Sequence, residues 1–129
     1  MKKINLLFLI LFIFSIGIYG CSTKDSTYKS ITVEQLKKEM EENPDMIILD
    51  VRTPQELEGP LGHIEGVINI PVQVLEERIS ELEKYKDKEI TVICRSGQRS
   101  GIASGILFKK GYKVTNVEGG MRAYVKSEK

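Results

Sequence analysis

The segment Glu89 to Ser100 constrains the fold more than any other part of the chain. Residues 90–93 are β-branched and nearly all apolar, a pattern typical of a strand that is buried on both faces of a parallel sheet. Beyond Ser100, apolar residues recur at helical spacing over residues 102–107, and Gly111 predicts where that helix stops. The segment therefore predicts a strand, a short loop and a helix in succession, which is the repeating unit of an α/β fold.

The rest of the domain continues this alternation. Thr32 with Gln35, and Thr53 with Glu56, have the spacing of capping boxes and predict two helix starts, the second with proline at its first position. Further strands are predicted at residues 46–51, 67–70 and 113–117, and further helices at 33–43, from 54, at 74–82 and after Gly120. With 129 residues, of which 41% are hydrophobic, we expect a single domain with a parallel central sheet and helices on both faces.

Residues 1–20 have the pattern of a secretory signal peptide. Lys2 and Lys3 give a positive start, and residues 6–18 are almost entirely Leu, Ile and Phe, an apolar stretch too short to favour a membrane span. The sequence ending at Cys21 resembles the lipobox of bacterial lipoproteins, although Tyr19 is larger than the usual residue there. This predicts lipid attachment at Cys21, with a plain N-terminal membrane anchor as the alternative.

The polar residues 21–29 lack periodicity and predict a flexible tether. We therefore expect an exported protein whose domain, residues 30–129, is anchored to the extracytoplasmic face of a membrane by its N-terminal lipid. Without Lys2 and Lys3 the chain has 17 basic and 18 acidic side chains, a net charge of −1, so nothing indicates a nucleic-acid partner.

Cys94 follows the predicted strand and lies close to two arginines, Arg95 and Arg99. A lone cysteine at the end of a strand is often only a small buried hydrophobe. Two guanidinium groups within five residues favour a functional thiol, because cations and a helix N-terminus both lower a thiol pKa from its ordinary value near ~8.5. Backbone N–H groups around Gly97 can also face an anion. The only other cysteine, Cys21, could form a disulfide with Cys94, but we interpret the pair as one lipid attachment site and one free thiol.

Four passages in order resemble the rhodanese domain, a sulfurtransferase family in which a loop cysteine carries a persulfide. They are ILDVRTPQEL at 48–57, GHIEGVINIP at 62–71, CRSGQRS at 94–100 and NVEGGMRAY at 116–124. Glu65 and Tyr124 depart from the usual proline and tryptophan, at positions that look structural. The passages span nearly all of the predicted domain.

The resemblance implies covalent catalysis through Cys94. The thiolate would take a sulfur atom from a donor such as thiosulfate and pass it to a thiol or cyanide acceptor. The backbone N–H groups of the binding loop, Arg95, Ser96, Gly97, Gln98 and Arg99, would stabilise the persulfide. Arg95 would hold the oxyanion end of the donor, while Arg99 would brace the loop through a carboxylate, for which Asp50 is the candidate. Arg52 could do either job. No cofactor or metal is implied.

Several alternatives stay open at this level. A carrier or redox sensor would load Cys94 with sulfur and pass it only to an unidentified partner protein. A cysteine-dependent phosphatase or arsenate reductase is the poorer fit, because its loop has five residues between cysteine and arginine and this one has four. His63, the single histidine, could act as a general base, although we expect a structural role, and one histidine does not build a metal site.

Overall fold

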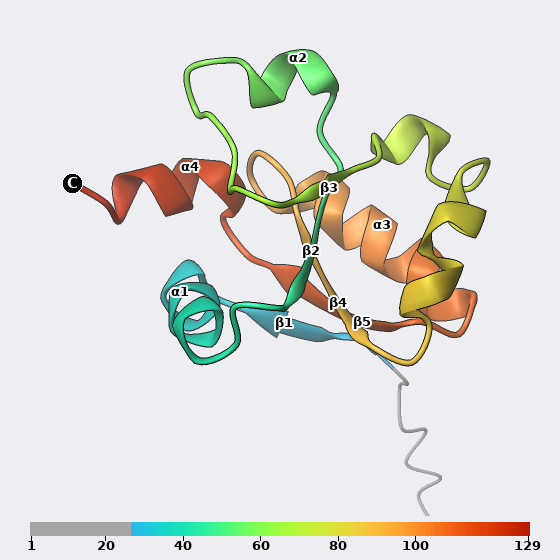
Figure 1. Ribbon diagram of the computed structural model, residues 1–129. Coiled ribbons are helices and arrows are strands. Elements are labelled where there is room, and N and C mark those ends of the chain that lie inside the picture. Colours follow the sequence, from blue (N-terminus) through green and yellow to red (C-terminus); the bar gives the residue numbers. More distant parts are fainter. Residues whose placement is uncertain (1–26) are drawn as a thin grey trace, which may run out of the picture.

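A five-stranded parallel sheet organises residues 27–129, the part of the chain that the computed structural model describes. The strands lie in the order β1-β5-β4-β2-β3, so β4 is central. Figure 1 shows helices on both faces of this sheet, as predicted. The strand bounds are β1 Lys29–Ile31, β2 Ile47–Asp50, β3 Ile68–Asn69, β4 Glu89–Ile93 and β5 Lys113–Val117.

Two helices begin where the capping boxes place them, while α3 begins at Gln98, before the predicted start beyond Ser100. Both capping boxes are formed, at Thr32 before α1 and at Thr53 before the short α2, and the loop at 59–62 follows α2. Gly111, with a positive φ of 85°, directly follows the turn that ends α3. The α-helical bounds are α1 Val33–Glu42, α2 Pro54–Leu57, α3 Gln98–Lys109 and α4 Gly120–Lys126.

The alternating side chains of β4 divide the interior into two cores. Ile90, Val92 and Cys94 belong to the core on the α3 side. Ile93 belongs to the core under α1 and α4, which also contains Val117 of β5. Each fully buried aliphatic side chain of this kind contributes about 1.5–3 kcal/mol relative to an exposed one. The strand that precedes Cys94 is therefore held from both faces, which fixes the position of the thiol.

Two predictions about secondary structure are wrong. Residues 74–82 do not form an amphipathic helix, because the segment folds as two 3-10 helices, η2 Val72–Val74 and η3 Ile79–Tyr85, separated by turns. Leu75 and Leu82 are both fully buried in the core on the α3 side, and this tertiary packing overrides the helical periodicity of the segment. The predicted tether also ends too late, since Lys29 already begins β1, which pairs with β5. Only Ile31 of this short strand is buried, so it carries almost no periodic signal.

The leader and Cys21 lie outside the described residues, so the predictions of a signal peptide and of lipid attachment are untested. Within residues 27–129, no helix has the length and apolar character needed to cross a membrane.

Candidate active site

Cys94 lies at the carboxyl edge of the sheet, directly after β4. Two residues separate it from Gly97, which precedes α3 with a φ of 99°, in the left-handed region that favours glycine. The loop therefore closes tightly and directs the N-terminal end of α3 at the sulfur. In open α/β sheets this edge is where ligands bind.

The Cys94 thiol is 1% exposed and lies within hydrogen-bonding distance of Gly97 and Ser100. The Gly97 backbone N–H donates to Sγ at 3.1 Å, and the Ser100 hydroxyl lies 3.4 Å from Sγ. Burial raises the pKa of this thiol, but the bonds from the Ser100 side chain and from the backbone of Ser100, Ser96 and Gly97 outweigh it, so the net pKa is lowered. This site therefore stabilises the nucleophilic thiolate relative to an ordinary cysteine.

The N-terminus of α4 fixes the orientation of the loop backbone. The Met121 N–H donates to the Cys94 carbonyl at 2.8 Å, and the Arg122 N–H donates to the Arg95 carbonyl at 3.0 Å. These two hydrogen bonds hold the backbone of Cys94 and Arg95 against the start of α4. Gly120 permits this close approach, since a Cβ there would lie 2.5 Å from the Cys94 carbonyl oxygen. The sequence predicted only that a helix follows Gly120, and did not reveal this contact with the loop.

Arg99 pairs with Glu56, and the prediction of Asp50 as its partner is wrong. The pair is bidentate, with Nη1 and Nη2 each 2.7 Å from a carboxylate oxygen. The Arg99 guanidinium holds the pKa of Glu56 well below its usual range, at about 2. The pair joins α2 to the loop across 43 residues of sequence. Glu56 was identified in the sequence only as a capping residue, and it keeps that role through the Thr53 N–H.

Asp50 is occupied by Arg52 instead. Both side chains are buried, and Arg52 Nη2 lies 2.7 Å from Asp50 Oδ2. The same nitrogen donates to the Gly62 carbonyl at 2.8 Å, and Nη1 donates to the Glu56 carbonyl at 3.4 Å. The Arg52 guanidinium therefore holds the segment that carries Glu56, and it also lines a cavity together with Arg95. Which of its two predicted roles Arg52 performs stays a prediction.

The other predicted loop residues, Arg95, Ser96 and Gln98, have exposed side chains. The Arg95 guanidinium has no ionic partner within residues 27–129, and it lines a cavity of about 380 Å³ beside the loop. His63 is exposed, and its Nδ1 lies 3.2 Å from the Leu57 carbonyl, which agrees with a structural role. Which of these residues take part in catalysis stays a prediction.

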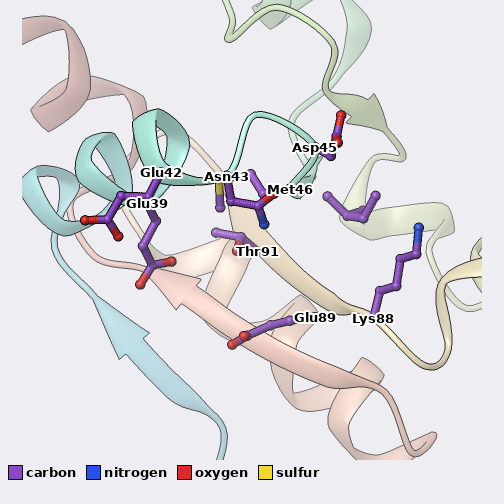
Figure 2. Close-up of a pocket in the computed structure, with 9 residues that line it drawn as sticks. Glu39, Glu42, Asn43, Asp45, Met46, Lys88, Glu89 and Thr91 are labelled. Carbon is purple, nitrogen blue, oxygen red and sulfur yellow. The ribbon is translucent and has the colours of Figure 1, made fainter.

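A second cavity, of about 500 Å³, lies at the opposite, amino-terminal edge of the sheet. Figure 2 shows its polar lining, with Glu39 and Glu42 of α1, and Lys88 and Glu89 where β4 begins. None of its lining residues belongs to the loop that follows Cys94. In the described part of the chain, no group of three or more His, Cys, Asp or Glu side chains could hold a metal ion.

Comparisons with known proteins agree with this geometry. Residues 32–127 match the model of the rhodanese-like domain. The chain is 39% identical over 102 residues to the putative sulfur carrier protein YrkF of Bacillus subtilis, covering 78% of this chain but only about half (53%) of that relative. It is 35% identical over 74 residues to the thiosulfate sulfurtransferase PspE of Escherichia coli, covering 57% of this chain and 69% of PspE.

A rhodanese-related protein from Thermoplasma volcanium has a similar solved structure. Its TM-score is 0.69 at 36% identity, with 78% of this chain and 93% of that chain covered. The family match extends from the start of α1 to the end of α4 and therefore includes every element that positions Cys94. The chain belongs to the rhodanese-like domain family.

Proposed function

We propose that this protein is a sulfurtransferase that moves a sulfane sulfur from a thiosulfate-like donor to a thiol or cyanide through a persulfide on Cys94. The observation that carries the proposal is the buried thiol, whose pKa is lowered by N–H and hydroxyl groups directed at it. The same groups would stabilise the terminal sulfur of a persulfide by hydrogen bonding, because that sulfur is also an anion. The sulfurtransferase name of PspE supports the reaction class.

The reaction has two balanced steps. In the first, the Cys94 thiolate attacks the sulfane sulfur of the donor, an S–S bond forms, and the S–S bond of the donor breaks with its electron pair leaving on sulfite. In the second, an acceptor thiolate or cyanide takes the outer sulfur and the Cys94 thiolate returns. No proton needs to move at Cys94 in either step, so the site requires charge stabilisation rather than a general base.

The loop size supports sulfur rather than phosphate chemistry. Gly97 N–H already contacts Sγ at 3.1 Å, and only four residues separate Cys94 from Arg99. A ring this tight suits a single sulfur atom and would crowd a phosphoryl group, which presents three equatorial oxygens. Turnover of aryl phosphates would contradict this reasoning.

The test uses the full chain with Cys21→Ser, in which Cys94 is the sole cysteine. After incubation with thiosulfate, the intact mass should increase by one sulfur atom, and added cyanide should remove it as thiocyanate. Cys94→Ser in the same background should show neither event. Absence of thiocyanate formation with every small sulfane donor would overturn the proposal.

A carrier is the second candidate, favoured by the nearly complete burial of the thiol and by the carrier name of YrkF. A carrier would accept the sulfur and release it only to a partner protein. Persulfide that forms on Cys94 but resists cyanide and small thiols would identify this function.

We also propose that the chain is exported and attached to a membrane through lipid on Cys21. The proposal depends on the sequence of residues 1–21. Cells fed labelled palmitate should label the protein and retain it in the membrane fraction, and Cys21→Ser should abolish the label. A wild-type protein without label would contradict lipid attachment.

A further inference from the structure

The cavity of about 500 Å³ at the amino-terminal edge of the sheet has an acidic lining. It lies between the C-terminal end of α1 and the first residues of β2 and β4 (Figure 2). Its lining carboxylates are those of Glu39, Glu42, Asp45 and Glu89. The C-terminal end of a helix adds a partial negative charge, and α1 has no basic residue in its last turn to offset it. The cavity therefore favours a cation.

The lysines near this cavity do not cancel its charge. Two of the carboxylates have lysine partners, in the pairs Lys29–Glu39 at 3.2 Å and Lys38–Glu42 at 3.8 Å. Neither lysine lines the cavity, and ion pairs as exposed to solvent as these are weak. The other two carboxylates have no ionic partner within residues 27–129. Lys88 is the one lining lysine, so negative charge remains in excess.

Thr91 adds a buried hydroxyl to the lining. Ile90 and Val92 belong to the core on the α3 side, so the Thr91 side chain between them faces α1 and the cavity. Thr91 is 3% exposed, and its hydroxyl has no hydrogen-bond partner among the described residues, whereas that of Thr115, opposite it on β5, donates to Glu89. Side-chain polar groups buried to this degree are normally paired. The Thr91 oxygen is therefore free to accept a hydrogen bond from a cation that carries N–H donors.

The carboxylates are spread around the cavity instead of meeting at one point. Within residues 27–129, no three acidic side chains are placed to hold a metal ion together. Met46 and Ile47, both half-buried, form an apolar part of the wall. A compact ion would reach few of the carboxylates and leave this apolar part uncovered. The complementary cation is extended, with separate charges joined by an apolar segment.

From this arrangement we propose that the cavity binds a linear aliphatic polyamine, a chain of ammonium groups joined by methylene groups. Its end groups pair with carboxylates of α1 and of β4, its methylene groups cover Met46 and Ile47, and one N–H donates to the Thr91 hydroxyl. The cavity and Cys94 lie at opposite edges of the sheet. This binding site is therefore separate from the thiol, and the inference goes beyond the proposed sulfurtransferase.

The test compares two dications of equal charge. The full chain with Cys21→Ser is titrated at fixed ionic strength with 1,4-diaminobutane or with Mg²⁺, and the amide resonances of Met46, Glu89 and Thr91 are followed. The Kd of the diamine should be about tenfold lower than that of Mg²⁺, which keeps its water shell and gains nothing from the apolar wall. Butylamine, with one ammonium group, should bind about fivefold more weakly than the diamine. Equal Kd values for the diamine and Mg²⁺ would show only diffuse attraction between charges and would overturn the proposal.

Variants separate a built site from general attraction to an acidic surface. Thr91→Val keeps the side-chain shape and removes the hydroxyl, and it should weaken diamine binding about fivefold. Glu42→Gln should weaken it about twofold to fivefold. Glu76→Gln is the matched control, because Glu76 is as exposed as Glu42 in class but does not line the cavity, and its Kd should equal that of the parent.

Two outcomes of these titrations would overturn the polyamine site. One is diamine binding that is unchanged by Thr91→Val, and the other is an equal loss of affinity in Glu42→Gln and Glu76→Gln. Cys94→Ser should bind the diamine as the parent does. A protein that binds the diamine but transfers no sulfur would therefore overturn the proposed function and leave this inference standing, and the reverse result would do the opposite.

Discussion

Gly120→Ala tests whether α4 sets the geometry of the thiol loop. An alanine Cβ would lie 2.5 Å from the Cys94 carbonyl oxygen and 2.6 Å from the Arg95 carbonyl carbon, and these backbone atoms cannot move aside cheaply. The φ of Gly120 is also positive, at 57°. The left-handed backbone costs about 1–2 kcal/mol for an alanine, and overpacking adds about 1–3 kcal/mol. We therefore expect the free energy of unfolding to fall by about 2–5 kcal/mol.

Gly66→Ala is the matched control for backbone strain. Gly66 has a φ of 80°, and within residues 27–129 no atom beyond its chain neighbours lies within 4 Å of the position that its Cβ would occupy. This variant should lose only the backbone contribution, about 1–2 kcal/mol. Urea unfolding of both variants measures the difference, which isolates the contact between α4 and the loop.

The thiol provides a second, chemical measurement. In the Cys21→Ser background, the pH dependence of iodoacetamide alkylation reports the pKa of Cys94. Gly120→Ala should raise this pKa, because a displaced Cys94 carbonyl turns the following N–H groups away from Sγ, while Gly66→Ala should leave it unchanged. If Gly120→Ala is no less stable than Gly66→Ala and titrates like the parent, then α4 does not orient the loop.

Three further predictions concern the groups around the thiol. Ser100→Ala should raise the thiol pKa measured by alkylation, because it removes the hydroxyl 3.4 Å from Sγ. Ser104→Ala should not, because the Ser104 hydroxyl lies on the same helix but has no hydrogen-bond partner among the described residues. Glu56→Gln should lower stability in urea by about 1–2 kcal/mol at neutral pH, as expected for a charge-assisted pair. Because the folded pKa of Glu56 is lowered from 4.5 to about 2, its contribution is complete above pH 4.5 and is lost as the pH falls toward 2, so parent and variant should converge there. Arg52→Met should cost about 3–5 kcal/mol of unfolding free energy by leaving the buried Asp50 carboxylate unpaired, and a cost below 1 kcal/mol would show that this ion pair does not brace the fold.

The parts of the site that the sequence could predict are local ones. The strand, Cys94, Gly97 and the start of α3 follow one another within about a dozen residues, and each carries a backbone preference that can be recognised directly. The capping boxes can be recognised in the same way, because each one spans only four residues. These features place the thiol at the correct edge of the sheet before any tertiary contact is known.

The partner of Arg99 could not be predicted in this way. Asp50 and Glu56 both lie near the carboxyl end of β2, and spacing alone does not distinguish them. The partner of Arg99 depends on Arg52, because the Arg52 guanidinium pairs with the buried Asp50 carboxylate. The partly exposed Glu56 carboxylate on α2 is then the group that pairs with Arg99. The capping box predicts only that Glu56 accepts a hydrogen bond from the Thr53 N–H. Its two carboxylate oxygens accept that bond and also pair with Arg99.

The contact between α4 and the loop has a consequence for how the thiol behaves. Burial alone would raise the pKa of Cys94, and the net lowering comes from the Ser100 side chain and from the backbone of Ser100, Ser96 and Gly97. We expect this backbone to keep its orientation only while α4 holds the carbonyls of Cys94 and Arg95. Unfolding releases these contacts, and the pKa then returns toward about 8.5. Because the folded pKa is the lower one, the thiolate stabilises the fold fully above the unfolded pKa, and this stabilisation is lost as the pH falls through the folded value. The reactivity of the thiol and the stability of the fold therefore both depend on the contact between α4 and the loop. A variant that loosens α4 should raise the pKa of Cys94 and also lower the free energy of unfolding.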